Sequence, residues 1–267
     1  MWTAPKIKVA KSARIGRALT MVTAYDATQA RWCARSRCDF ILVGDSLGMV
    51  IQGGPDTTNV TVDAVEYHTR AVRCGAPEKF VIADLPFGSY QVSIEDGVRN
   101  SVRLMRAGAS AVKLEGAGPW LPLVERLTAT GIPVFGHLGL TPQSIHQFGG
   151  FKLQAKNPEE AERLIADAQA LEKCGCIGIV LEVIPRGLAA QVTRVLSVPT
   201  IGIGAGADTD GQVLVMHDLL GMNQEFSPKF VKRYAEFEAL AVEALNAFCG
   251  EVADHQFPSE THSFRGE

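Results

Sequence analysis

The chain has 267 residues, of which 46% are hydrophobic and 21% are charged, with six cysteines and a formal net charge of -3. This apolar content excludes an intrinsically disordered chain, and six cysteines at this length exclude a small disulfide-stapled fold. The balance of 26 basic against 29 acidic residues argues against nucleic acid or an anionic membrane as a partner, because both attract positively charged surfaces.

No uninterrupted apolar run reaches the roughly 18 residues that a transmembrane helix needs. The basic N-terminal segment has no apolar stretch of the kind that a secretion signal contains. We therefore expect a cytoplasmic protein whose cysteines stay unpaired in a reducing compartment.

Eight short apolar runs recur along the chain, and each ends in glycine or a polar residue. The body of each run is continuously apolar, which is typical of parallel strands that are buried on both faces. The runs span residues 20–26, 40–46, 80–85, 109–116, 132–139, 177–184, 198–204 and 212–218.

Helical patterns lie between these runs. Thr61, Ser93 and Asn157 are good helix-capping residues, and each precedes a helical pattern. The dipeptide at 227–228 predicts the start of a long terminal helix, whose apolar stripe begins at Phe230. Strands that alternate with helices indicate a parallel α/β fold, and eight strands favour a closed (β/α)8 TIM barrel over an open sheet.

We expect one domain over residues 1–267, because no linker, low-complexity stretch or short repeat divides the chain. Its core is a barrel over about residues 20–248. An N-terminal extension precedes this barrel, and a polar tail follows over residues 249–267.

Charged residues recur where the expected strands end, and the carboxyl ends of the strands carry the active site in (β/α)8 barrels. Any single one could be a solvated strand end. Charged side chains are rarely buried unless they are paired or bind a ligand, so recurrence over six strands points to a site. The strand ends carry Tyr25-Asp26, Asp45-Ser46, Asp84, Lys113 with Glu115, His137, Glu182 and His217-Asp218.

Three of these residues, Asp45, Asp84 and Glu115, place oxygen donors on neighbouring strands. Carboxylates that lie close together repel each other unless a cation lies among them. Hard oxygen ligands suit Mg²⁺. The alternative interpretation is a salt-bridge cluster around Lys113, a residue that can also hold an anionic substrate.

Two further features of the sequence have more than one interpretation. His137 is either an accessory residue of the site or a histidine that is hydrogen-bonded in the barrel mouth. The glycine-rich turn at 202–206 matches a dinucleotide-binding fingerprint only weakly, because no βαβ unit follows it. The same turn is compatible with a phosphate-like anion, and therefore with an isomerase that needs no metal.

Ordered motifs over nearly the whole chain, from about Thr23 to Phe264, resemble those of the ketopantoate hydroxymethyltransferase family. The motifs are TAYD at 23–26, VGDSLGM at 43–49, ADLPF at 83–87, KLEG at 113–116, GHLGLTPQS at 136–144, LEVIP at 181–185, IGIGAG at 201–206, DGQVLVMHDLLG at 210–221 and PKFVKRY at 228–234.

The resemblance implies a TIM barrel with one Mg²⁺ per subunit, assembled as a decamer of two pentameric rings. It implies transfer of a one-carbon unit from the co-substrate 5,10-methylenetetrahydrofolate to 3-methyl-2-oxobutanoate. The product would be 2-dehydropantoate, a precursor of pantothenate. Glu182 matches the residue that accepts a proton in this family.

The remaining site residues also carry over from the resemblance. Asp45 and Asp84 match ligands of Mg²⁺ that also lie at the substrate. Glu115 matches the third acid of the metal site, which acts directly or through water. Ser46 and Lys113 match residues that hold the keto acid.

The chain departs from the family pattern in two loops that are candidates to close over the site. In the loop 48–61, Thr58-Asn59 stands where Leu-Pro is common. In the loop 148–156, Phe151 and Ala155 stand where the family has Tyr and Gly. Two other functions remain alternatives: a Mg²⁺-dependent keto-acid lyase or mutase of the isocitrate lyase and phosphoenolpyruvate mutase type, and a non-catalytic metabolite-binding barrel.

Overall fold

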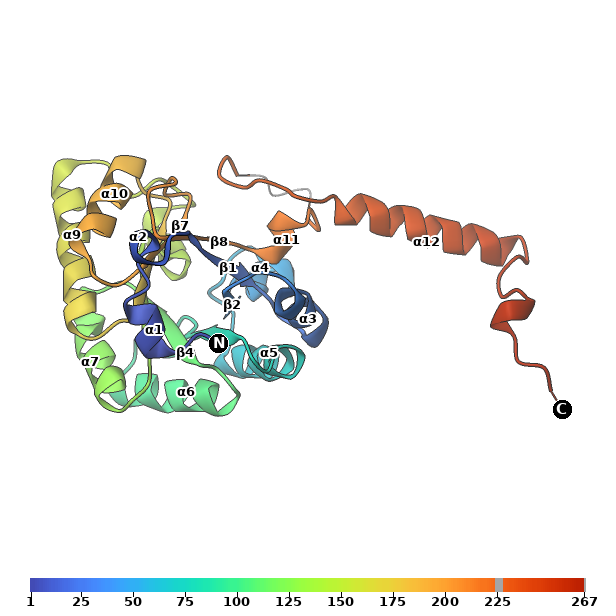
Figure 1. The fold of residues 1–267 in the computed structure, drawn as a ribbon, viewed down its shortest axis with the longest axis horizontal. Helices are drawn as coiled ribbons and strands as arrows, with labels where there is room; N and C mark the ends of the chain where they lie inside the picture. The colour runs from blue at the N-terminus through green and yellow to red at the C-terminus, as the bar shows by residue number, and fades with distance from the viewer. Residues whose placement is uncertain (224–227, 267) are drawn as a thin grey trace. The chain divides into compact units, whose positions relative to one another are not determined.

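The computed structural model describes residues 1–223 and 228–266. These residues group into two compact units, Met1–Val215 and Met216–Glu267, and the single domain over residues 1–267 stays a prediction. The first unit is a closed barrel in which each of eight strands pairs with the next and β8 pairs with β1 (Figure 1). All eight pairings are parallel, so the predicted (β/α)8 TIM barrel is confirmed.

The strands follow the predicted apolar runs closely, and every residue of β2, β3 and β4 is buried. Burial on both faces is the reason that these runs are continuously apolar. The strands are β1 (Leu19–Thr23), β2 (Phe40–Val43), β3 (Phe80–Asp84), β4 (Ala111–Glu115), β5 (Val134–Gly139), β6 (Gly178–Glu182), β7 (Thr200–Ile203) and β8 (Gly211–Leu214).

Three helices of the barrel begin at the predicted caps. The side chains of Thr61, Ser93 and Asn157 accept hydrogen bonds from backbone N–H groups in the first turns of α5, α6 and α9. The helices of the first unit are α1 (Ala4–Lys8), α2 (Ser12–Ile15), α3 (Ala27–Arg35), α4 (Leu47–Val50), α5 (Val62–Gly75), α6 (Ile94–Arg106), α7 (Leu121–Ala129), α8 (Ile145–Phe148), α9 (Pro158–Lys173) and α10 (Arg186–Val195), with 3-10 turns η1 (Gly118–Trp120) and η2 (Pro142–Ser144).

The N-terminal extension packs into the barrel core. Ile7 of α1 and the following Ala10 are fully buried, and they belong to one apolar cluster with Phe40, Phe80 and Phe135. These aromatic residues begin or line the strands β2, β3 and β5. The extension therefore supplies part of the hydrophobic core rather than lying loosely on the surface.

Two buried aspartates anchor this extension. The Asp39 carboxylate accepts hydrogen bonds from the Trp2 indole (2.9 Å) and from the Arg17 guanidinium (2.6 and 2.7 Å). Burial alone would raise the pKa of Asp39, but these hydrogen bonds outweigh it and hold the pKa below its usual value. Lys11 pairs with Asp210 at 2.6 Å.

Strand eight is shorter than predicted. β8 ends at Leu214, and the residues His217-Asp218 lie instead in a short helix, α11 (Met216–Leu219). The last pairing of β8 joins Leu214 to Val22, one residue before β1 ends. The apolar run continues beyond this point, but β1 ends one residue later at Thr23, so most of the remaining run has no strand to pair with.

The terminal helix also begins later than predicted. It is α12 (Phe237–Ala253), followed by the turn η3 (Glu260–His262). Ser227 lies outside the described residues, and the segment from Pro228 to Glu236 is not helical. Its backbone bonds elsewhere: the N–H groups of Tyr234 and Phe237 donate to carbonyls at the end of α11 and just after it, at 2.8 and 3.0 Å. The apolar period that includes Phe230 was therefore misleading. At its other end, α12 reaches five residues beyond the predicted boundary at 248.

Within the part of the chain that the structure describes, no helix combines the length and the apolar character needed to cross a bilayer.

Ile7→Ala tests the role of the N-terminal extension in the core. Removing a fully buried isoleucine side chain should lower the free energy of unfolding by about 3 kcal/mol, because burial energy is lost and a cavity forms. Urea unfolding measures this change. Val9→Ala is the matched control, since Val9 lies on the same extension with 55% of its surface exposed, and its effect should stay within about 0.5 kcal/mol. Equal effects of the two substitutions would contradict the account of the core.

Candidate active site

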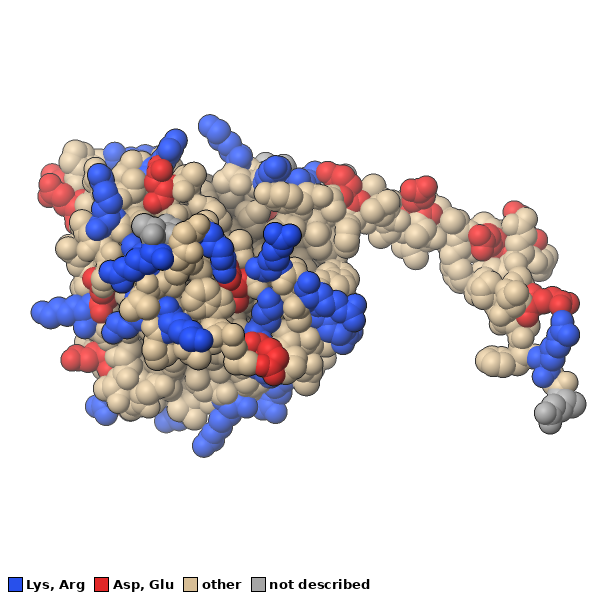
Figure 2. Space-filling model, in the orientation of Figure 1, with Lys and Arg blue, Asp and Glu red and all other residues tan. Residues whose placement is uncertain are grey.

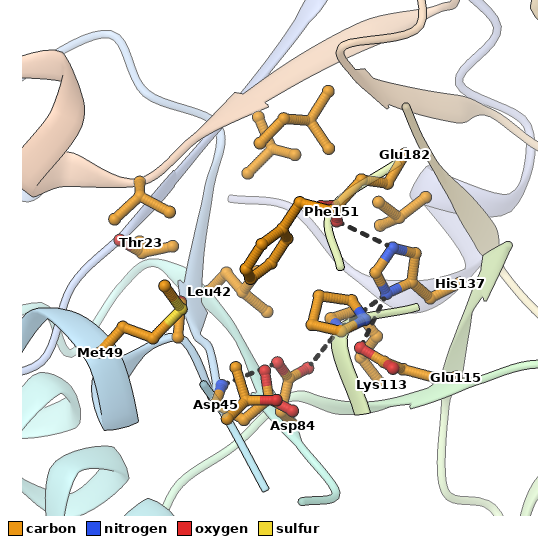
Figure 3. Close-up of a pocket in the computed structure, with 17 residues that line it drawn as sticks. Thr23, Leu42, Asp45, Met49, Asp84, Lys113, Glu115, His137, Phe151 and Glu182 are labelled. Carbon is orange, nitrogen blue, oxygen red and sulfur yellow. Dashed lines mark hydrogen bonds and ion pairs between the residues drawn. The ribbon is translucent and has the colours of Figure 1, made fainter. Parts of the chain in front are cut away.

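A cavity of about 90 Å³ opens at the carboxyl ends of the barrel strands. One water molecule needs roughly 10–15 Å³ on this measure, so the cavity suits a molecule of several heavy atoms. All seven residues predicted for the site line this cavity, and most are shown in Figure 3. They are Asp45, Ser46, Asp84, Lys113, Glu115, His137 and Glu182.

Three strand-end residues that were not proposed for the site, Asp26, His217 and Asp218, do not line the cavity. The Asp26 carboxylate caps α3 by accepting hydrogen bonds from the backbone N–H groups of Thr28 and Gln29, at 2.7 and 2.8 Å. A charged residue at a strand end can therefore serve only as a helix cap, as Asp26 does.

Strand register brings the charged residues side by side. Asp84 is paired with Lys113, and Glu115 is paired with His137, on the adjacent strands β3, β4 and β5. Lys113 and Glu115 are two residues apart on β4, and alternate residues of a strand point to the same face. Both side chains therefore reach the barrel interior from one strand.

Lys113 and Asp84 form the central ion pair of the site, with Nζ and Oδ1 2.9 Å apart and both side chains buried. Burial alone would lower the pKa of Lys113. The carboxylates of Asp84, Glu115 and Asp45 outweigh this effect and raise the pKa above its usual value. The lysine is therefore a permanent cation.

Asp45 sits beside this pair, and its backbone N–H donates to Asp84 Oδ2 at 3.0 Å. Burial raises the pKa of Asp45 well above its usual value, and the carboxylates of Asp84 and Glu115 raise it further. The pKa of Asp84 is also raised by burial, although Lys113 opposes the shift. The site thus holds more negative charge than one lysine balances.

His137 connects the second half of the site. Its Nδ1 lies 3.2 Å from Glu115 Oε1, and its Nε2 lies 3.1 Å from Glu182 Oε2. Burial and the ammonium of Lys113 lower the pKa of His137, but the two carboxylates prevail and raise it to about 9. In turn, burial would raise the pKa of Glu115, and the bond with His137 holds it below its usual value. His137 is therefore an imidazolium between two carboxylates.

Ser46 is oriented from behind by Tyr25. Its hydroxyl lies 2.8 Å from the phenol of Tyr25. The backbone of Tyr25 is held in turn, because its N–H donates to Gln29 Oε1 (2.9 Å) and its carbonyl contacts His68 Nδ1 (2.6 Å). Burial raises the pKa of Tyr25 above its usual value, so the phenol stays protonated next to the serine.

Glu182 is the last residue of β6, and the chain turns sharply after it. Val183 has a φ of +47°, a left-handed conformation that is strained for a β-branched residue. The surrounding backbone holds this turn: the Val183 N–H donates to Ile203 (2.8 Å), and its carbonyl accepts from the Gln154 N–H (3.0 Å). Gln154 belongs to the loop 148–156, so this loop is tied to the residue that follows Glu182.

Apolar side chains make up much of the remaining lining of the cavity. Leu42, Val180 and Val213 line it from strands β2, β6 and β8. Phe151, 46% exposed, comes from the loop 148–156, and its ring lies across the cavity between the charged residues and Met49 (Figure 3). The cavity thus combines charged and apolar lining residues, as a small amphipathic ligand requires.

The donor set fits a hard divalent cation that is held by few protein ligands. Within residues 1–223 and 228–266, no three side chains among His, Cys, Asp and Glu converge as a complete metal site. Mg²⁺, however, is commonly bound by only one or two carboxylates together with water and substrate. Asp45 and Asp84 meet that requirement, whereas Glu115 is engaged by His137. The surplus of buried carboxylate charge favours such a cation.

The sequence reasoning missed Gln143, Tyr25 and Tyr90 as parts of the site. Gln143 donates to Asp45, Tyr25 contacts Ser46, and the Tyr90 hydroxyl accepts from the backbone N–H of Glu115 at 3.2 Å. The sequence offered one indication that these three residues belong to the site, namely that each lies in the segment that follows a strand. Uncharged side chains at such positions carry no charge pattern that could distinguish them.

The fold and this site together define a (β/α)8-barrel enzyme with a buried acid–base centre. Solved structures of similar fold include a phosphonopyruvate hydrolase, with a TM-score of 0.61 and 13% identity over 100% of this chain and 92% of that one. A 2,3-dimethylmalate lyase gives a TM-score of 0.59 and 17% identity over 97% and 90% of the two chains. At such low identity, these similarities concern the fold alone.

Sequence comparison is more specific. The model of the family described as ketopantoate hydroxymethyltransferase matches residues 2–260. A 3-methyl-2-oxobutanoate hydroxymethyltransferase of Pseudoalteromonas translucida is 54% identical over 248 residues, which cover 92% of this chain and 93% of the relative. The one of Pelobacter propionicus is 50% identical over 263 residues, or 98% and 97% of the two chains. The chain therefore belongs to the ketopantoate hydroxymethyltransferase family and is a transferase.

Proposed function

We propose that the protein transfers a hydroxymethyl group from 5,10-methylenetetrahydrofolate to 3-methyl-2-oxobutanoate, giving 2-dehydropantoate for pantothenate synthesis. Relatives that are about half identical over nearly the whole chain are named for this activity. The observation that carries the proposal is the cavity itself, in which Lys113, Asp84 and Glu182 face one small space with an apolar wall.

The keto acid has a charged end and an apolar end, and the cavity has charged and apolar lining residues. Its carboxylate is an anion, and Lys113 is the buried cation that can pair with it, with the Ser46 hydroxyl as a further hydrogen-bond donor. Its branched alkyl group is apolar, and Leu42, Val180 and Val213 offer an apolar wall. A five-carbon acid of this kind suits a cavity of about 90 Å³.

Asp45 and Asp84 would hold one Mg²⁺ per subunit, with Glu115 placed to hold a water of the ion or to bind it directly. When bound, Mg²⁺ supplies Lewis-acid stabilisation of the negative charge that develops on the keto oxygen. Lys113 adds a second positive charge on the same side of the cavity. Together these groups favour loss of a proton from the carbon next to the keto group.

Glu182 is the group that takes this proton. Its side chain is only 15% exposed and faces the cavity, and His137 contacts it at 3.1 Å. The His137 imidazolium orients the Glu182 carboxylate through this ion pair. The carbon that has lost its proton then forms a bond to the methylene carbon of the folate. One of the two bonds between that methylene carbon and the folate nitrogens breaks as this bond forms. Water supplies the hydroxyl oxygen as the second of these bonds breaks, and the two nitrogens of the released tetrahydrofolate take up the proton lost by the keto acid and the one lost by the water.

The folate must approach from outside, because it is far larger than the cavity. Its entrance is bordered by Met49 and Thr57 of the loop 48–61 and by Phe151 of the loop 148–156. Asp56 of the first loop lies 3.5 Å from His146 of α8, the short helix that leads into the second loop. Closure of both loops would keep water from the reacting carbon until the new bond has formed.

The lyase and mutase alternative gains no support beyond the fold. The similar lyase and hydrolase structures share 17% and 13% identity with this chain, and barrels of one architecture host many reactions. The isomerase alternative rests on the glycine-rich turn at 202–206, and of these residues only Ile203 lines the cavity. The non-catalytic alternative leaves the buried acids and the buried lysine of the cavity without a role.

We further propose a cytoplasmic homodecamer of two pentameric rings that has no nucleic-acid or membrane partner. All six cysteines are free, which suits a reducing compartment. Self-association is supported by α12, which has no buried residue and carries the exposed apolar side chains Leu240, Leu245 and Phe248. Figure 2 shows mostly uncharged side chains along this helix, with isolated acids.

Glu182→Gln tests the proton acceptor. The measurement is NMR of 3-methyl-2-oxobutanoate in D₂O with Mg²⁺, which reports exchange of the hydrogen next to the keto group. We expect the exchange rate to fall by about 100-fold or more, because a neutral amide is a very poor base. Glu162→Gln is the control, since Glu162 is an exposed residue of α9 and its variant should exchange at the original rate. Undiminished exchange in Glu182→Gln would assign the proton to another group.

A further inference from the structure

One buried amide touches two of the three acids at the mouth of the barrel. Gln143 belongs to the turn η2, directly after β5, and only 5% of its surface is exposed. Its side chain donates to Asp45 Oδ2 at 2.8 Å, and its backbone N–H donates to Glu115 Oε2 at 3.0 Å. A residue of the turn that follows β5 thereby connects the acid that follows β2 with the acid that ends β4.

The surroundings determine which end of the amide faces Asp45. The Gln143 Nε2 atom lies 2.9 Å from the carbonyl oxygen of Leu85, and a carbonyl can only accept a hydrogen bond. The amino end therefore points toward Leu85 and Asp45, and its two hydrogens serve these two acceptors. Neither hydrogen remains for another partner.

The carbonyl end is held from the other side. Gln143 Oε1 accepts from the Gln91 side chain at 3.0 Å and from the Tyr90 hydroxyl at 3.0 Å, whose single hydrogen is shared with the carbonyl of Glu115 at 3.1 Å. Tyr90 is itself fixed, because its hydroxyl accepts from the backbone N–H of Glu115 at 3.2 Å. Four side-chain hydrogen bonds on one amide prevent it from rotating, so its N–H toward Asp45 has a fixed direction.

A neutral donor has a specific advantage at this place. Lys113 stabilises the carboxylates by charge, and a positive charge also opposes the arrival of a metal cation. The amide of Gln143 has no net charge, so it reduces the cost of burying Asp45 without that opposition. It occupies one oxygen of Asp45, which fixes the rotation of the carboxylate and leaves the other oxygen for a further partner.

We propose that Gln143 is a positioning residue that holds Asp45 and Glu115 in the arrangement that a divalent cation requires, and so sets the affinity of the protein for that ion. This inference rests on the proposed function, because the ion is part of that proposal. The competing view is that Gln143 only fastens the start of the loop after β5 to the barrel. That role would change stability but not metal affinity.

Gln143→Met separates the two views. Methionine has nearly the same length and shape, and the backbone N–H to Glu115 remains, so the variant removes only the side-chain bonds. The probe is Mn²⁺, titrated into metal-free protein while electron paramagnetic resonance reports the free ion. We expect the dissociation constant to rise about tenfold or more, as is usual when a residue that supports a metal ligand is lost. The Mg²⁺ concentration for half-maximal hydroxymethyl transfer should rise in parallel, and the rate at saturating Mg²⁺ should fall much less.

Asn100→Leu is the matched control. Asn100 is also a partly buried amide that donates to a backbone carbonyl, that of Ser89, at 2.7 Å, but it contacts no acid of the site. It should lose stability without any change in Mn²⁺ affinity. If Gln143→Met does not fold, Tyr90→Phe replaces it, because this change removes one restraint on Gln143 and keeps the aromatic ring. We expect Tyr90→Phe to weaken Mn²⁺ binding about two- to fivefold, a smaller loss than for Gln143→Met.

The outcomes distinguish the two levels of the proposal. Wild-type protein that binds no Mn²⁺ would overturn the proposed metal site and the role of Gln143 with it. Wild-type protein that binds Mn²⁺, together with a folded Gln143→Met or Tyr90→Phe variant of equal affinity, would overturn the role of Gln143 alone and leave the proposed function standing.

Discussion

Charge balance among buried side chains governs this site. Asp45, Asp84 and Glu115 are all buried at one end of the barrel, where an uncompensated carboxylate is very costly. Lys113 and the His137 imidazolium offset most of that charge at distances near 3 Å. Glu182 contacts the other side of the His137 ring and adds one more negative charge. The remaining excess of negative charge supports the proposed metal cation, and the basic groups support the proposed anionic substrate.

The strand register of the barrel places the charged side chains that balance each other side by side. Parallel pairing places Asp84 beside Lys113 and Glu115 beside His137, so the charges are neutralised between neighbouring strands rather than along one strand. The uncharged residues refine the arrangement, since Gln143 fixes Asp45 and Tyr25 fixes Ser46. The N-terminal extension contributes to the hydrophobic core among the same strands, so the scaffold under the site depends on residues that precede the barrel.

The fold was largely predictable from the sequence because strands buried on both faces have continuous apolar runs. The charged site residues were predictable for a related reason, since a charge that directly follows such a run stands out. The end of β8 and the start of α12 were not predictable, because each depends on partners: β1 stops near Leu214, and Tyr234 finds its hydrogen bond at Leu219. Gln143 was missed because its role depends on the direction of its amide, which only the fold determines.

We propose that this barrel forms a carbon–carbon bond between a keto acid and a one-carbon unit carried by folate. The most direct test combines the protein with 3-methyl-2-oxobutanoate, 5,10-methylenetetrahydrofolate and Mg²⁺, and follows 2-dehydropantoate by NMR. We predict one 2-dehydropantoate for each tetrahydrofolate released, and loss of both when a chelator removes the metal. Absence of 2-dehydropantoate, or its undiminished formation with excess chelator, would contradict the account.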